Sequence, residues 1–249
     1  MKLEVNNLKK NYGAKEALKG VSFTLTNGVY GLLGPNGSGK STLMNILTGN
    51  LKATDGEVLC DNQEIGEMGI KYRELVGYMP QQQALYPDFT AMQFLSYIAA
   101  LRGMKKKYAK ERISYALDAV ELSDVREKRI KTLSGGMKQR LLIAQAILDD
   151  PKLLIMDEPS AGLDPKQRVE MRNLISSLAK DKTVLISTHV VSDIDDISKE
   201  ILLLRNGKLI KSGTKDELFE EAAPHIEKPV KVNTYDIDLE DIYLYYFGE

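Results

Sequence analysis

Residues 34–41 read Gly34-Pro35-Asn36-Gly37-Ser38-Gly39-Lys40-Ser41 and fit the pattern G-x-x-x-x-G-K-[ST]. An apolar stretch, residues 29–33, comes directly before this loop, and apolar residues at helical spacing follow it over residues 43–47. In such an order the backbone N–H groups of the loop curl around an anion, and the helix N-terminus adds partial positive charge. The loop therefore predicts a nucleotide phosphate site, in which Lys40 reaches the terminal phosphates and Ser41 ligates Mg²⁺.

A second motif consists of two acidic residues, Asp157 and Glu158, that directly follow an apolar stretch at residues 153–156. A buried strand brings its last side chains to the C-terminal edge of a parallel sheet, where ligands of α/β proteins bind. We expect Asp157 to hold Mg²⁺ and Glu158 to act as the general base that orients the attacking water. His189 closes the next apolar strand and is placed to hydrogen-bond the γ-phosphate or the catalytic acid.

The pattern of elements around these motifs predicts the fold class. Short strands and turns fill the first third of the chain, helical spacing dominates residues 86–150, and alternating strands and helices return after Pro151. We predict an α/β fold with a parallel sheet, a β-rich opening and an inserted α-helical subdomain. The glycine loop resembles that of P-loop NTPases, and this resemblance implies a RecA-like core with an N-terminal antiparallel β subdomain. The main domain is expected over residues 1–222, with the helical subdomain at about 86–150, followed by an acidic and aromatic tail over 223–249.

Composition excludes several classes of protein. Hydrophobic residues make up 43% and charged residues 28% of the 249 positions, which argues against a disordered, collagen-like or coiled-coil chain. The 34 Lys and Arg residues nearly balance 35 Asp and Glu residues, so no strong net field attracts nucleic acid, and no nucleic-acid partner is expected. The single cysteine, Cys60, cannot form an internal disulfide and is expected to be buried. No apolar run approaches the ~20 residues of a membrane span, and no signal peptide is apparent. We expect a cytoplasmic protein.

A further motif, Leu133-Ser134-Gly135-Gly136-Met137-Lys138-Gln139-Arg140, opens a predicted helix. It offers a second anion-binding helix N-terminus. Together with the glycine loop, Asp157-Glu158 and His189 in this order, it makes residues 1 to 220 resemble the nucleotide-binding subunit of ATP-binding cassette (ABC) transporters. The resemblance implies that this motif meets the γ-phosphate held by the glycine loop of a partner subunit, with two ATP molecules sandwiched in a head-to-tail dimer. Homodimer and heterodimer both remain open.

The resemblance assigns roles to further positions. Tyr12 matches the aromatic residue that stacks on adenine, and Asp164 in Ser160-Ala161-Gly162-Leu163-Asp164 matches the residue that stabilises the dimer interface. Gln81 matches the glutamine that reaches Mg²⁺ and the attacking water. Because Gln82 and Gln83 follow it, the matching residue could also be the next one along the chain. The implied cofactors are ATP and Mg²⁺. The implied catalytic residues are Glu158, His189, Lys40 and Gln81; the nucleotide-binding residues are Tyr12, Gly34, Pro35, Asn36, Gly37, Ser38, Gly39, Lys40, Ser41, Thr42, Ser134, Gly135, Gly136 and Asp164; the metal ligands are Ser41, Asp157 and Gln81.

Two departures from the common family pattern point to a branch. Met137 stands where many members carry Gln, and Gly162 lengthens the loop before Asp164. Both features, with the tail at residues 238–245, resemble bacterial drug and antibiotic exporters of the ABC-2 type. That resemblance implies an ATPase on the inner face of the cytoplasmic membrane that powers export through a separate permease. The tail is open to two interpretations, a helix that covers its own domain or a partner-binding segment.

Two rival functions are weighed against the transporter motor. A soluble ABC ATPase acting on nucleic acid or ribosomes usually carries two cassettes, long coiled coils or zinc-binding cysteines, and none is visible in this sequence. A regulatory subunit that binds ATP without turnover is disfavoured because every catalytic position is filled. Short basic clusters such as residues 105–107 are better explained as a solvated face.

Overall fold

The computed structural model of the protein describes residues 1–81, 85–226 and 238–248, so Gln82 and Gln83 lie outside the described residues. One of its two sheets is antiparallel and has the order β2-β1-β4-β5. Its strands are β1 (Leu3–Tyr12), β2 (Lys15–Leu25), β4 (Asp55–Cys60) and β5 (Gln63–Glu64). The predicted N-terminal antiparallel subdomain is confirmed, and Cys60 is buried within it, as expected.

The central sheet has the order β10-β9-β3-β8-β7-β6. Its strands run parallel from β9 to β6, and within the described part of this sheet only the pairing of β10 with β9 is antiparallel. The strands are β3 (Gly28–Leu33), β6 (Val76–Met79), β7 (Leu153–Asp157), β8 (Thr183–Thr188), β9 (Glu200–Arg205) and β10 (Lys208–Gly213). The predicted α/β class with a parallel core sheet is therefore confirmed.

Both faces of this sheet are covered, which explains why its strands read as continuous apolar runs. In β7, Leu153 and Ile155 pack into one hydrophobic cluster, whereas Leu154 and Met156 pack into the other. The first cluster also holds helix α1 (Lys40–Leu47) and the inner face of the antiparallel sheet. The second holds most of the remaining helices. The central sheet thus lies between two buried layers.

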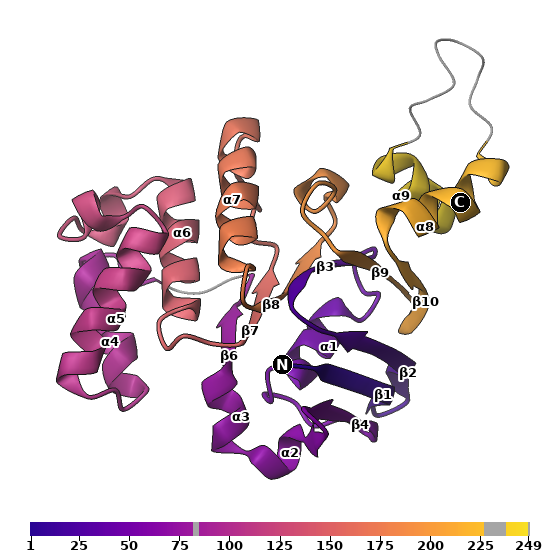
Figure 1. The fold of residues 1–249 in the computed structure, drawn as a ribbon, viewed down its shortest axis with the longest axis horizontal. Coiled ribbons are helices and arrows are strands. Elements are labelled where there is room, and N and C mark those ends of the chain that lie inside the picture. The colour runs from indigo at the N-terminus through magenta and orange to yellow at the C-terminus, as the bar shows by residue number, and fades with distance from the viewer. Residues whose placement is uncertain (82–84, 227–237, 249) are drawn as a thin grey trace.

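The helices divide into groups that Figure 1 separates clearly. Three helices from the middle of the chain, α4, α5 and α6, gather on the side of β6 that lies away from the antiparallel sheet, and α8 and α9 lie beside β10. The helices after α1 are α2 (Ile65–Met68), α3 (Ile70–Leu75), α4 (Ala91–Leu101), α5 (Lys106–Ala119), α6 (Gly135–Ala146), α7 (Pro165–Leu178), α8 (Lys215–Ala222) and α9 (Leu239–Phe247). Short 3₁₀ turns are η1 (Ser123–Val125), η2 (Ile130–Thr132), η3 (Val191–Asp193) and η4 (Ala223–His225).

Helix α9 in the tail packs against α8 and against η3. Its side chains Leu239 and Ile242 are buried in the same cluster as the helical side of the central sheet. Arg205 Nη1, at the end of β9, donates a hydrogen bond of 3.0 Å to the carbonyl oxygen of Tyr246. The described part of the tail is therefore a helix that covers its own domain, while Leu244 on its outer side is 62% exposed.

Ile242→Ala should lower the free energy of unfolding by about 2–5 kcal/mol, because it deletes buried methyl groups and leaves a cavity. Leu244→Ala is the matched control in the same helix, and its exposed side chain should change stability by less than about 0.5 kcal/mol. Urea denaturation followed by circular dichroism measures both variants. Equal midpoints for the two variants would contradict the docking of α9 on the core.

Candidate active site

The site is built where neighbouring parallel strands of the central sheet end. β3, β8 and β7 are adjacent in the sheet, and their C-terminal ends lead into the glycine loop, His189 and Glu158 respectively. A hollow of about 430 Å³ opens at this edge. The predicted residues that line it are Tyr12, Asn36, Gly37, Gly39, Lys40, Ser41, Thr42, Gln81, Asp157 and Glu158. The structure thus brings together most of the site residues predicted within one chain.

The glycine loop owes its shape to close backbone contacts. A side chain at Gly34 would meet the carbonyl oxygen of Leu204 at 2.2 Å. Gly39 has a φ of 112°, in the left-handed region, and a side chain there would meet the carbonyl oxygen of Ala17 at 2.8 Å. Glycine is therefore required at both positions, and the loop runs directly into the N-terminus of α1.

Lys40 is the first residue of α1 and is 8% exposed. Its Nζ donates hydrogen bonds to the carbonyl oxygens of Gly34, at 2.5 Å, and Pro35, at 3.1 Å. Burial lowers the pKa of Lys40 below its ordinary value, and the negative charges of Glu158 and Asp157 act in the opposite direction. The ammonium group therefore lies close to both acids, at the point where a terminal phosphate would replace the loop carbonyls as its partner.

The acidic pair is buried, and its two members face different partners. The Asp157 carboxylate accepts a hydrogen bond from Ser187 Oγ in the adjacent strand β8. Glu158 has a φ of 52°, a left-handed conformation that only a few per cent of non-glycine residues adopt. Its Oε1 lies 2.8 Å from His189 Nδ1, while the His189 side chain is 58% exposed. The Glu158 carboxylate is thus held by the fold, and the side chain of its partner His189 is largely exposed.

The donor set at the hollow fits a magnesium ion. Ser41 supplies a hydroxyl oxygen, Asp157 a carboxylate and Gln81 an amide oxygen, and all three line the same space. Hard oxygen ligands of this kind, together with water and substrate phosphates, are what Mg²⁺ prefers. The assignment of these ligands stays a prediction.

One wall of the hollow was not predicted from the sequence. The turn at Asn206 and Gly207, between β9 and β10, lines the hollow, and Gly207 N donates to the Ser38 carbonyl oxygen at 2.8 Å. The Asn-Gly pair is a recognisable hairpin signal. Nothing in the local sequence, however, indicates that this hairpin lies against a loop 170 residues earlier in the chain.

The Ser134 motif does not join this hollow within one chain. Ser134 and Gly136 line a separate hollow of about 300 Å³, with Leu163 and Gln167 among the other lining residues. The Ser134 hydroxyl caps α6 by accepting a hydrogen bond from Met137 N at 3.2 Å. Asp164 likewise caps α7 by accepting from Gln167 N at 2.9 Å. The two predicted halves of the nucleotide site therefore line two separate hollows of the same chain.

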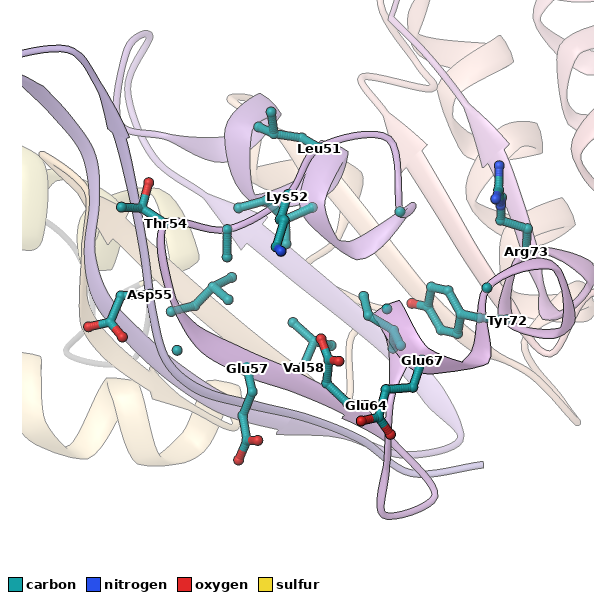
Figure 2. A pocket seen from close by; sticks show the side chains of 18 residues that line it. Leu51, Lys52, Thr54, Asp55, Glu57, Val58, Glu64, Glu67, Tyr72 and Arg73 are labelled. Atoms are coloured by element: carbon teal, nitrogen blue, oxygen red, sulfur yellow. The ribbon is translucent and has the colours of Figure 1, made fainter.

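A larger hollow, of about 680 Å³, lies between the antiparallel sheet and α3 (Figure 2). Side chains such as Val58 and Tyr72 form its apolar floor, and Lys52, Glu57 and Glu64 stand around its rim. Tyr72 Oη is already satisfied by a 2.5 Å bond to the Leu47 carbonyl oxygen. The residues that line this hollow include none of the predicted site residues, so its size alone does not make it the active site.

Comparison with known proteins identifies the family. A family model described as ABC transporter matches residues 18–161. The chain belongs to the ABC transporter family. This ABC protein is 39% identical over 225 residues to the uncharacterized ABC transporter ATP-binding protein YxlF of Bacillus subtilis (strain 168), a match covering 90% of this chain and 75% of that protein. It is also 36% identical over 218 residues to the linearmycin resistance ATP-binding protein LnrL of the same strain, covering 87% of this chain and 70% of that protein.

Solved structures support the same assignment of this ABC protein. The dimeric structure of MJ0796, a bacterial ABC transporter cassette, superposes with a TM-score of 0.75 at 27% identity, covering 85% of this chain and 98% of that one. The ABC protein is therefore an ATP-binding cassette with ATPase activity, as predicted from its motifs. Its resemblance to the drug and antibiotic exporter branch is confirmed by relatives such as LnrL.

Proposed function

We propose that this ABC ATPase powers export of a substrate through a separate membrane-spanning permease, in an ATP-dependent dimer with a second nucleotide-binding subunit. The observation that carries the proposal is the division of the nucleotide site: one hollow holds Lys40, Asp157 and Glu158, and another, on the same chain, holds Ser134 and Gly136. Two chains arranged head to tail would unite these halves twice, because each would offer its Ser134 helix terminus to the other's glycine loop.

In the proposed reaction, the residues of the hollow that contains Lys40 and Glu158 have separate roles. Lys40 and the loop N–H groups hold the phosphates, and Glu158 accepts a proton from the attacking water while fixing its position. His189, whose Nδ1 lies 2.8 Å from Glu158 Oε1, would keep that carboxylate oriented and stabilise the γ-phosphate. Mg²⁺, held by Ser41, Asp157 and Gln81, would neutralise charge on the phosphates. Tyr12, which is 50% exposed, offers its ring to adenine.

Hydrolysis would be coupled to movement through differential binding. ATP contacts both subunits only when the dimer is closed, so it favours the closed state, and loss of the γ-phosphate removes that preference. The permease attached to each subunit would follow this opening and closing. Among the helices that the structure describes, none combines the length and apolar character needed to cross a bilayer.

The direction of transport and the location rest on the relatives. LnrL is named as a linearmycin resistance protein, and the Nod factor export ATP-binding protein I of Rhizobium sp. (strain N33) is 34% identical over 221 residues, covering 88% of this chain and 73% of that protein. Export, and a place on the inner face of the cytoplasmic membrane, follow by analogy. We further propose residues 1–222 as the ATP-binding domain, with a helical subdomain at about 86–150, and residues 223–249 as a tail.

Co-purification tests the proposal directly. A tagged Glu158→Gln chain is expressed in its native cell, trapped with ATP and extracted gently from the membranes. We expect a multi-span membrane protein to co-purify in roughly stoichiometric amount, and mass spectrometry identifies it. The Lys40→Ala chain is the control, since it should not be trapped by ATP. Recovery of ribosomal or DNA-repair proteins, with the chain absent from the membrane fraction, would overturn the transport function and favour a soluble ABC ATPase.

A further inference from the structure

Asp193 lies in η3, which follows β8 and His189 in the chain, and its side chain is 4% exposed. It does not line the nucleotide hollow. We propose that Asp193 is a positioning residue for ATP hydrolysis, which ties the loop 160–164 to the strand end that carries His189. The inference rests on the proposed function, because it assumes that loop 160–164 faces the second subunit.

The carboxylate of Asp193 is the meeting point of three side chains from different elements. Its Oδ2 accepts a hydrogen bond from Ser160 Oγ, in the loop that follows Glu158, and another of 3.2 Å from Thr188 Oγ1 at the end of β8. Arg168 Nη1, on α7, donates to its Oδ1 at 3.2 Å. Such charge-assisted bonds are stronger than neutral ones, so the three elements are held as one unit.

Two of the partners of Asp193, Thr188 and Arg168, also contact a second group. Thr188 Oγ1 also lies 3.4 Å from Glu158 Oε2, and Thr188 immediately precedes His189 in the chain. The hydroxyl of Thr188 therefore stands between the carboxylates of Asp193 and Glu158. A shift of Asp193 would alter both the end of β8 and the surroundings of the Glu158 carboxylate.

Arg168 extends the connection toward the dimer interface. Its Nε donates to the carbonyl oxygen of Leu163 at 3.2 Å, one residue before Asp164. The same guanidinium group thus holds the loop and Asp193 together. If Asp164 contacts the partner subunit, closing of the dimer reaches Glu158 and His189 through Arg168, Asp193 and Thr188.

The chemistry of this cluster argues for a role beyond packing. Burying a carboxylate and a guanidinium contributes little net stability compared with apolar residues of similar volume. Fixed hydrogen-bond geometry, by contrast, specifies where the strand end and the loop lie relative to each other. A displacement of about 1 Å at a catalytic group can cost 10²-fold in rate.

The test separates positioning from binding and from stability. Asp193→Asn keeps the shape of the side chain but removes the charge and one acceptor oxygen. In the full chain, we expect kcat for phosphate release to fall by at least about tenfold, with the Kd of a fluorescent ATP analogue changed by less than about twofold. In the Glu158→Gln background, where hydrolysis does not interfere, Asp193→Asn should also reduce the ATP-dependent dimer seen by size-exclusion chromatography.

The matched control is Asp195→Asn, two residues along the same segment. Asp195 forms an ion pair with Lys215 on α8, and its loss should leave kcat and dimer formation within about twofold of the wild type. Ser160→Ala removes a single hydroxyl donor to Asp193. This variant replaces Asp193→Asn in the test if Asp193→Asn folds poorly. It should lower kcat with unchanged ATP affinity, and the double variant should fall no lower than Asp193→Asn alone, because both act through one connection.

The outcomes distinguish this inference from the proposed function. Wild-type kcat and wild-type dimer formation in Asp193→Asn, or in Ser160→Ala where Asp193→Asn does not fold, would overturn the positioning role. Equal losses in Asp193→Asn and Asp195→Asn would also overturn it, since they would reflect general damage to the segment. A wild-type chain that releases no phosphate would count against the proposed function, and the dimer measurement would then decide on Asp193 independently.

Discussion

Replacing Glu158 with Gln is expected to reduce kcat for ATP hydrolysis by about 10²- to 10⁴-fold, the range for loss of a general base. Glutamine keeps the size of the side chain and its hydrogen bond to His189, but it cannot accept the proton of the attacking water. The backbone at this position is held in a left-handed conformation, and Glu158 N donates to the Ser187 carbonyl oxygen at 2.9 Å. The substituted amide should therefore stay in place. ATP should bind normally, and the closed dimer should accumulate.

A phosphate-release assay and size-exclusion chromatography with ATP measure the two effects. Glu57→Gln, on the rim of the larger hollow between the antiparallel sheet and α3, is the matched control. It should leave kcat and dimer formation unchanged. A Glu158→Gln chain that hydrolyses ATP at the wild-type rate would remove Glu158 from the mechanism, and an effect of Glu57→Gln of similar size would show that the larger hollow contributes to turnover.

Replacing Lys40 with Ala should weaken ATP binding by about 10- to 100-fold, since a charge-assisted bond to phosphate contributes about 1.5–3 kcal/mol. Phosphate release should fall with it. Stability should not fall in parallel, because burial lowers the pKa of Lys40 below its ordinary value. A lysine with a lowered pKa in the folded state opposes folding wherever the group is charged, at pH values below its usual range, so removing it lifts that cost at neutral pH.

Isothermal titration calorimetry with ATP and a thermal melt test this separation of binding from stability. Lys52→Ala is the control, because Lys52 is exposed on the larger hollow and should leave both quantities unchanged. Wild-type ATP affinity in Lys40→Ala would contradict the assignment of the phosphate site. A large drop in melting temperature would instead mean that the bonds of Lys40 to Gly34 and Pro35 stabilise the loop itself.

The sequence predicts those parts of the site that depend on a strand and the residues next to it. Gly34 to Ser41 and Asp157-Glu158 each follow an apolar strand, and the edge at which parallel strands end is common to all of them. The same reasoning explains the fold class, because an uninterrupted apolar run such as residues 153–156 requires a sheet covered on both faces.

Contacts between distant segments could not be predicted in this way. Two examples are the hydrogen bond between Gly207 and Ser38 and the bonds of Asp193 to Ser160 and Arg168. These contacts depend on how whole elements pack against one another. Apolar spacing also overstates burial on the outer helices: Val169 on α7 is 46% exposed and Leu101 on α4 is 67% exposed. A periodic pattern identifies a helix, but it does not tell which positions at the margin of the apolar stripe are covered.

The division of the nucleotide site between two hollows would make ATP turnover depend on how abundant the protein is. Under the proposed head-to-tail arrangement, a lone chain carries Lys40 and Glu158 at one hollow and Ser134 at another, so it would bind nucleotide without completing a reaction centre. Turnover in dilute solution is then second order in chain concentration. Attachment of two chains to one permease raises their effective concentration to the millimolar range typical of short tethers. ATP consumption in the cell would then be confined to assembled complexes, and surplus unassembled chains would not hydrolyse ATP.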